Sequence, residues 1–239
     1  MPSYDGYGLV SLSSTAAHWL GAGSLTAPIL GDEILGKFAD RYENVVVILA
    51  DALGYNQLRR LMEAGQAPHW KEQLEQGSLF PITSITPSTT ASALTTIWTT
   101  TAPNQHGVIG YEMWHKELGL VMNNILHTPI TYRGDIGGLS RAGFEPTSFM
   151  NQPPLGQRLG NHGVESHAFL PASIANSGLS QMQLPSSHLH AYSAESDLLL
   201  NMRDLLNHTS KHRRFMYAYW SDVDSLMHRY GTYDERVTQ

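Results

Sequence analysis

Two short, almost uninterrupted apolar runs stand out from the mixed polar and apolar pattern of the chain. Residues 44–50 (NVVVILA) are rich in β-branched side chains, and residues 215–220 (FMYAYW) form the second run. Continuous apolar runs of this length are typical of strands that are buried on both faces of a parallel sheet. Both runs therefore predict central strands.

Helical spacing follows the first run and recurs later in the chain. Helices are predicted at residues 57–64, 154–159 and 194–206, and a further strand at residues 163–170. Alternating strands and helices favour the α/β class. We therefore expect an α/β three-layer sandwich with a mainly parallel central sheet.

The remaining segments have weaker patterns. Residues 1–43 predict an irregular arm with one weak helical stretch, and residues 111–125, divided by Gly119, predict a hairpin inserted beside the sheet. No internal repeat and no low-complexity linker divides the chain. We expect one domain over residues 1–239.

Charge and composition exclude several functional classes. Fifteen Lys and Arg residues stand against 21 Asp and Glu residues, which gives a net charge of −6 and argues against binding nucleic acid by phosphate neutralisation. The absence of cysteine excludes disulfides, thiolate zinc sites and cysteine nucleophiles. The first residues lack the pattern of a secretory signal, and no apolar stretch is long enough for a membrane span. We expect a cytoplasmic protein.

Asp51 follows directly after the first predicted strand. Ligands of open parallel sheets bind beyond the carboxyl ends of the strands, and a carboxylate there can hold a divalent metal ion. The alternative is that Asp51 caps the following helix.

A hydroxyl-rich run occupies residues 82–103, with nine threonines and three serines in 22 positions. Its apolar residues recur at helical spacing, and Ser88 is the expected N-cap, which places Thr89 and Thr90 in the first turn. The start of a helix favours phosphate, and a hydroxyl held there by a metal can act as a nucleophile. The alternative, which we favour for most of these threonines, is that the hydroxyls bond back to helix carbonyls.

A second candidate metal-ligand pair follows the second apolar run. Asp224 and His228 are four residues apart, so in a helix they lie on one face and can chelate one zinc ion. The alternative is an N-cap aspartate with an exposed histidine. Asp222 is two residues away and is not expected to join the pair.

Together these segments resemble the alkaline phosphatase superfamily, and within it the type I phosphodiesterase/nucleotide pyrophosphatase family. The resemblance is carried by VVVILADALG, by TPSTTASALTTIWTTTAPNQHGVIGYEMW and by YWSDVDSLMHRYG, in the family's order. It covers residues 45–110 and 215–231. The run Pro-x-x-His-Gly-x-x-Gly from Pro103 to Gly110 and the Asp-Ser-x-x-His sequence are its most specific parts.

The resemblance implies a hydrolase of phosphoric esters with two divalent metal ions, expected to be zinc, and a small-molecule phosphate ester as substrate. Asp51 and Thr90 match ligands of one ion, and Thr90 also matches the nucleophile that forms a phospho-threonine. Asp224 and His228 match ligands of the other ion. His106 matches a motif residue that the family does not use as a ligand, so we interpret it as structural.

The sequence departs from the family in two places. Nucleotide pyrophosphatases have Phe, Pro and Asn after the nucleophile, whereas this chain has Ala91, Ser92 and Ala93, which leaves other phosphate esters or phosphonates open as substrates. No Asp-His-Gly sequence follows His228, so the resemblance matches only two ligands per ion. We therefore expect the chain to be the N-terminal part of a longer protein, with an α/β fold incomplete at its C-terminus, and to bind zinc weakly.

The main alternative is a non-catalytic relative that binds phosphate or a protein partner. A sulfatase is disfavoured because the chain lacks cysteine and has no arginine after Pro87 in the required context. A phosphoglycerate mutase-like enzyme would use serine where this chain has Thr90. The catalytic interpretation predicts that Asp51, Thr90, Asp224 and His228 converge at the carboxyl edge of one sheet.

Overall fold

The structure is a computed structural model that describes residues 1–23, 25–132 and 136–238. It divides into two compact units. The first unit contains residues 1–47 and 82–218, and the second contains residues 48–81 and 219–239. Within the described ranges, no helix combines the length and the apolar character needed to cross a bilayer.

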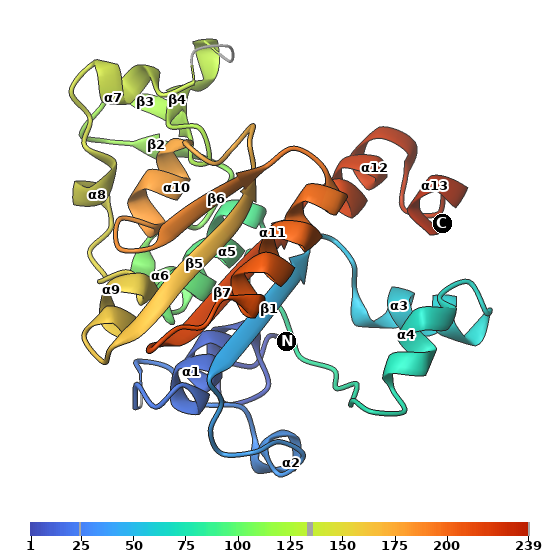
Figure 1. Ribbon diagram of the computed structural model, residues 1–239. Coiled ribbons are helices and arrows are strands. Elements are labelled where there is room, and N and C mark those ends of the chain that lie inside the picture. The colour runs from blue at the N-terminus through green and yellow to red at the C-terminus, as the bar shows by residue number, and fades with distance from the viewer. Residues whose placement is uncertain (24, 133–135, 239) are drawn as a thin grey trace. The chain divides into compact units, whose positions relative to one another are not determined.

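A four-stranded parallel sheet carries the fold (Figure 1). Its order is β1 (Asn44–Ala50), β7 (Arg213–Trp220), β5 (Val164–Pro171) and β6 (His188–Tyr192). The strands predicted at 44–50, 163–170 and 215–220 are confirmed, and so is the α/β class with a parallel sheet between helices. The prediction that residues 44–50 are buried on both faces is wrong, because β1 lies at an edge of the described sheet and exposes Val46 and Ile48. Strand β6 was not predicted, because the polar residues His188 and His190 interrupt its apolar pattern.

The first unit contains the helices that pack beside the parallel sheet. Those predicted at 154–159 and 194–206 are confirmed as α9 and α11. The helices of this unit are α1 (Leu9–Trp19), α2 (Asp32–Leu35), α5 (Thr90–Thr99), α6 (Pro103–His106), η1 (Ile130–Tyr132), α7 (Gly138–Arg141), α8 (Pro146–Phe149), α9 (Leu155–Gly160), α10 (Gly178–Gln183) and α11 (Glu195–Asn207).

Strand β7 packs against helix α5 on one face of the sheet and against helix α11 on the other. Successive side chains of a strand point to opposite faces. Phe215 and Tyr217 meet Trp98 of α5 edge-on, with ring centroids 6.1 and 5.3 Å apart, whereas Met216 and Ala218 join a buried cluster with residues of α11. The full burial of both sets explains why the sequence shows a continuous apolar run rather than an alternating one.

Residues 1–43 contain a helix, as the predicted weak helical stretch requires, but the description of this segment as an irregular arm is wrong for α1. This helix buries eight of its eleven residues and contacts α5, and its first backbone N–H, on Leu9, donates to the carbonyl of Thr83. Its buried positions are mostly serine, threonine and alanine. Such small side chains allow close helix approach but give only a weak amphipathic pattern, so the sequence alone did not reveal a core helix.

A small antiparallel sheet lies within the first unit. Strands β2 (Glu112–His115) and β3 (Leu120–Asn123) pair from Glu112 with Asn123 to His115 with Leu120, and β4 (Thr128–Pro129) pairs with β3. The turn between β2 and β3 contains Gly119 at φ +63°, a conformation that glycine adopts without a steric cost. Residues 111–125 therefore contain a hairpin.

The second unit joins the carboxyl ends of β1 and β7 to short helices. The backbone N–H of Asp51 donates to the carbonyl of Trp220, at 2.9 Å. The helix predicted at 57–64 is confirmed as α3, within two residues. The helices of this unit are α3 (Tyr55–Glu63), α4 (Pro68–Gln73), α12 (Asp222–Tyr230) and α13 (Glu235–Thr238).

Candidate active site

Asp51 is held firmly at the end of β1. Its Oδ2 accepts a hydrogen bond from the hydroxyl of Tyr219, at 2.7 Å, and its Oδ1 accepts one from the backbone N–H of Ala52, at 3.0 Å. The N-cap of α3 is Gly54, and no side chain caps that helix. The alternative interpretation of Asp51 as a helix cap is therefore wrong.

Tyr219 is a residue of this site that the sequence did not reveal. Its side chain is almost fully buried, and its hydroxyl fixes the orientation of the Asp51 carboxylate. Such hydrogen bonds orient the carboxylates that bind metal ions. In the sequence Tyr219 is one more aromatic residue of an apolar strand, and nothing in that pattern indicates its partner.

The turn after Asp51 is strained. Ala52 has φ +64°, in the left-handed region that residues with a Cβ adopt at a cost of about 1 kcal/mol or more. Strained backbone of this kind is concentrated at functional sites. The turn directs the chain away from the end of β1 directly after the carboxylate.

Asp224 and His228 lie on one face of α12, as their spacing predicts. Asp224 Oδ1 is 3.6 Å from His228 Nε2, and the aspartate side chain is 31% exposed against 81% for the histidine. A zinc ion lies about 2 Å from each of its ligand atoms, so two ligand atoms of one ion are at most about 4 Å apart. The pair therefore fits one divalent ion. Ser221, not Asp224, is the N-cap of α12.

Asp51 and Asp224 influence each other electrostatically within the second unit. Burial raises the pKa of Asp224, the negative charge of Asp51 raises it further, and His228 acts in the opposite direction. Two carboxylates that repel each other are stabilised by a cation between them. The oxygen and nitrogen donors suit a divalent ion, but no group of three or more acidic or histidine residues arranged to hold a metal occurs in the described part of the chain.

Thr90 is the first residue of α5 and is half-buried. The predicted N-cap, Ser88, is wrong by one residue: Thr89 has the extended backbone of an N-cap, and its Oγ1 accepts a hydrogen bond from the N–H of Ser92, at 3.4 Å. Thr90 belongs to the first unit, whereas Asp51, Asp224 and His228 belong to the second. The convergence of the four residues thus stays a prediction.

Other hydroxyls of the threonine-rich run serve packing. Thr95 donates to the carbonyl of Ala91 and Thr99 to that of Thr95, each at 2.7 Å, and both side chains are fully buried. These bonds follow the pattern of hydroxyls that bond back within a helix. The packing interpretation is confirmed for these two residues.

His106 has the environment of a structural residue. Its Nδ1 accepts from the N–H of Val108, at 3.1 Å, so its Nε2 carries the proton and donates to Thr96 Oγ1, at 3.0 Å. Burial lowers the pKa of His106 to about 4. Both ring nitrogens of the neutral His106 are therefore used in hydrogen bonds, and neither is free to bind a metal ion.

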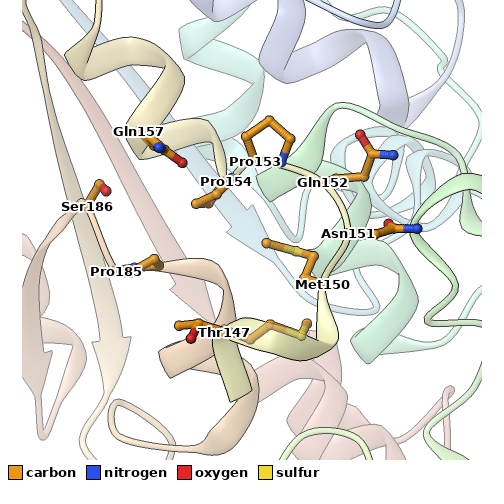
Figure 2. Close-up of a pocket in the computed structure, with 10 residues that line it drawn as sticks. Thr147, Met150, Asn151, Gln152, Pro153, Pro154, Gln157, Pro185 and Ser186 are labelled. Atoms are coloured by element: carbon orange, nitrogen blue, oxygen red, sulfur yellow. The ribbon is translucent and has the colours of Figure 1, made fainter. Parts of the chain in front are cut away.

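A pocket of about 450 Å³ opens in the first unit near α8, α9 and α10 (Figure 2). None of its ten lining residues is charged, and none is a predicted site residue, so it offers no electrostatic attraction to a phosphate. Its lining consists of Thr147, Met150, Asn151, Gln152, Pro153, Pro154, Gln157, Met182, Pro185 and Ser186.

A parallel sheet with carboxylates beyond its strands and a hydroxyl at a helix start is an arrangement typical of α/β enzymes. The model of one family, type I phosphodiesterase / nucleotide pyrophosphatase, matches residues 45–239, and the chain belongs to this family. The predicted resemblance is confirmed. The family consists of phosphoester hydrolases that are generally metal-dependent. No curated protein with which the sequence was compared matches it.

Proposed function

We propose that this protein hydrolyses small-molecule phosphoric esters through a covalent phospho-threonine at Thr90. The observation that carries the proposal is the pair Asp51 and Asp224, two carboxylates beyond strand ends whose mutual repulsion a divalent cation would relieve. Membership of a phosphoester hydrolase family supports the reaction class.

In the proposed reaction the hydroxyl oxygen of Thr90 attacks phosphorus, and the bond between phosphorus and the ester oxygen breaks. The leaving alcohol takes up the proton lost by the Thr90 hydroxyl, and the phosphoryl group is now bound to Thr90. A water molecule then attacks phosphorus, the bond from phosphorus to the threonine oxygen breaks, and one proton of the water returns to that oxygen. A monoester substrate thus releases phosphate, and a diester substrate releases a phosphomonoester. The backbone N–H groups at the start of α5 would stabilise the negative phosphoryl oxygens.

Asp51 and Thr90 would hold one divalent ion, and Asp224 and His228 the other, with zinc as the proposed metal. When bound, the ions would supply positive charge to the phosphoryl oxygens and lower the pKa of the attacking oxygen. Tyr219 would keep the Asp51 carboxylate oriented toward its ion.

The residues after Thr90 bear on the substrate. Ala91 and Ser92 are fully buried and Ala93 is half-buried, so this turn of α5 has no aromatic ring to stack on a nucleobase. A phosphate ester or phosphonate without a base is therefore the proposed substrate class.

The test compares wild-type protein with Thr90→Val, which keeps the shape of the side chain and removes its hydroxyl. With zinc and a chromogenic phosphodiester, turnover is expected to fall by about a thousandfold or more, the scale seen when a nucleophile is removed. Thr90→Ser should retain part of the activity. Acid-quenched wild-type protein should carry a phosphoryl group on the peptide that contains Thr90, detected by mass spectrometry.

The second candidate, a non-catalytic phosphate-binding relative, is favoured by the lack of a three-residue metal-binding group among the described residues. Phosphate binding by wild-type protein without turnover on any phosphoester would establish that candidate. Turnover unchanged in Thr90→Val would show that Thr90 is not the nucleophile.

A further inference from the structure

A second pocket in the first unit lies at the amino ends of the strands. Its volume is about 500 Å³, and its lining comes from three places: residues just before β1, Gly163 just before β5, and the segment that leads into β7. Asp51 follows the carboxyl end of β1. The pocket therefore belongs to the opposite strand ends from those where α/β proteins bind their substrates.

The pocket gathers positive charge in an otherwise acidic protein. The chain carries a net charge of −6 and only 15 Lys and Arg residues, yet Arg41, Lys211 and Arg213 line this one pocket together with His212. Glu43 is the acidic residue of the lining. Among the described residues, none of these four basic side chains forms an ion pair, with Glu43 or with any other acid.

Two of the guanidinium groups are neighbours. Both Arg41 and Arg213 place Nη1 against the bare Cα of Gly21, so that a Cβ at this position would collide with both atoms. Gly21 also has φ +71°, which glycine adopts freely. Like charges held side by side repel each other, and an anion that contacts both removes that repulsion.

Contacts with the end of α1 position the chain around Arg41. Tyr42 donates its backbone N–H to the carbonyl of Trp19, and the two rings meet edge-on with centroids 5.7 Å apart. Arg41 Nη1 donates to the carbonyl of His18, at 3.2 Å. The guanidinium is thus positioned by the end of α1 before an anion arrives, which lowers the entropic cost of binding.

The neighbouring Arg214, on the same strand, has a structural role and differs from Arg213. It is 5% exposed, and its guanidinium donates to Asn44 Oδ1 and to the carbonyls of Leu205 and His208. Its donors are used inside the protein. Arg213, one residue earlier, has no such hydrogen bond in the described structure and lines the pocket.

We propose that this pocket, whose lining includes Arg41, Lys211, His212 and Arg213 but not Thr90, is a binding site for a phosphate or pyrophosphate group. Paired guanidinium forks match the oxygens of phosphate, and a lysine ammonium adds a point charge. The group is either a free ion or the terminal phosphate of a larger molecule.

The test is calorimetric titration of the whole chain with inorganic phosphate, pyrophosphate and a phosphomonoester, at low ionic strength with a chelator present. The double variant R41Q/R213Q is expected to bind pyrophosphate at least about tenfold more weakly, because it loses two charged hydrogen-bond donors. E43Q should bind more tightly, because it removes the acidic residue of the lining. If the monoester and free phosphate bind with equal affinity, the site accepts the terminal phosphate of a larger molecule. If only inorganic phosphate and pyrophosphate bind, the site is specific for the free ions.

Three controls distinguish binding in this pocket from a general effect of charge and from binding at Thr90. R203Q removes one positive charge, half the change made by the double variant, from a surface ion pair on α11 and should leave the affinity within about twofold of wild type. T90V should bind as wild type does. G21A keeps every charge but displaces both guanidiniums, so it should weaken binding. No binding at millimolar pyrophosphate, unchanged binding in R41Q/R213Q when that variant is folded by circular dichroism, or an equal loss in R203Q would overturn the proposal.

Discussion

Helices α5 and α12 both carry candidate catalytic residues, but they are held in opposite ways. Eight of the ten residues of α5 are buried, whereas α12 has no buried residue. The threonines of α5 bond to its own carbonyls, to His106 and to Gln183. On α12, His228 is mostly exposed and lies near Asp224, whose side chain is 31% exposed.

This difference separates two ways of positioning a functional group. The position of Thr90 follows from the packing of the helix that it begins, and needs no ligand. The positions of Asp224 and His228 depend on electrostatic interactions between partly exposed side chains, including the charge of Asp51. We therefore expect the first unit to respond to changes in packing, and the second to respond to cations.

The largest loss of stability is expected when Trp98 of the first unit is replaced, and Trp70 of the second unit provides the comparison. Trp98 of α5 is 1% exposed, and Trp70 of α4 is 51% exposed. Trp98→Ala should lower the free energy of unfolding by about 3–5 kcal/mol, because it leaves a cavity among Phe215 and Tyr217. Trp70→Ala should change it by less than about 0.5 kcal/mol. Denaturant unfolding measures both, and equal losses would show that the units do not differ in packing.

Acid should destabilise the first unit next most strongly. Burial lowers the pKa of His106 to about 4, and burial with the charge of His115 lowers that of His127 to about 4, from an ordinary value of 6.5. The unfolded chain therefore binds more protons than the folded protein below pH 6.5, and stability falls as the pH decreases from 6.5 toward 4. Between pH 7.5 and 5.0 the loss is about 2 kcal/mol for each histidine.

The variant His106→Gln checks this assignment, since glutamine keeps a hydrogen bond and takes up no proton. Its unfolding free energy should decrease less steeply between pH 7.5 and 5.0 than that of wild type. A variant of the exposed His69, which is 92% exposed, should keep the wild-type slope. Identical slopes for His106→Gln and wild type would exclude His106 as a source of the acid sensitivity.

The sequence predicted the elements whose signal is local and missed those that depend on distant contacts. The strand at 44–50 and the Asp224–His228 face follow from composition and spacing alone. The burial of helix α1 and the existence of strand β6 were missed because their polar residues are buried or placed by partners far along the chain, such as α5 and β5. Tyr219 was missed for the same reason, since its hydroxyl meets a carboxylate 168 residues away.

Zinc should stabilise the second unit to a smaller extent. At a free zinc concentration ten times the dissociation constant, binding adds about 1.4 kcal/mol of stability, and with two matched ligands we expect that constant to be weak. Hydrogen exchange of the α12 amides should slow on addition of zinc. Asp224→Ala should abolish the effect, and His69→Ala, which removes the histidine of another helical His–acid pair in this unit, should not. Equal protection in wild type and Asp224→Ala would show that α12 does not bind the ion.

The smallest effect is expected at Thr89, and it tests the register of the nucleophile. Thr89 caps α5 through an acceptor bond of 3.4 Å from the N–H of Ser92, which is longer than an ordinary hydrogen bond of this type. Thr89→Ala should therefore cost about 0.5–1 kcal/mol, at the lower end for a lost N-cap. Thr89→Ser should restore most of that stability. Turnover on a chromogenic phosphodiester should stay within about twofold of wild type in both variants, because the hydroxyl that attacks phosphorus belongs to the next residue. If Thr89→Ala abolished turnover at unchanged stability while Thr90→Val kept it, the nucleophile would be Thr89, and the alignment of this helix with the family would be wrong by one position.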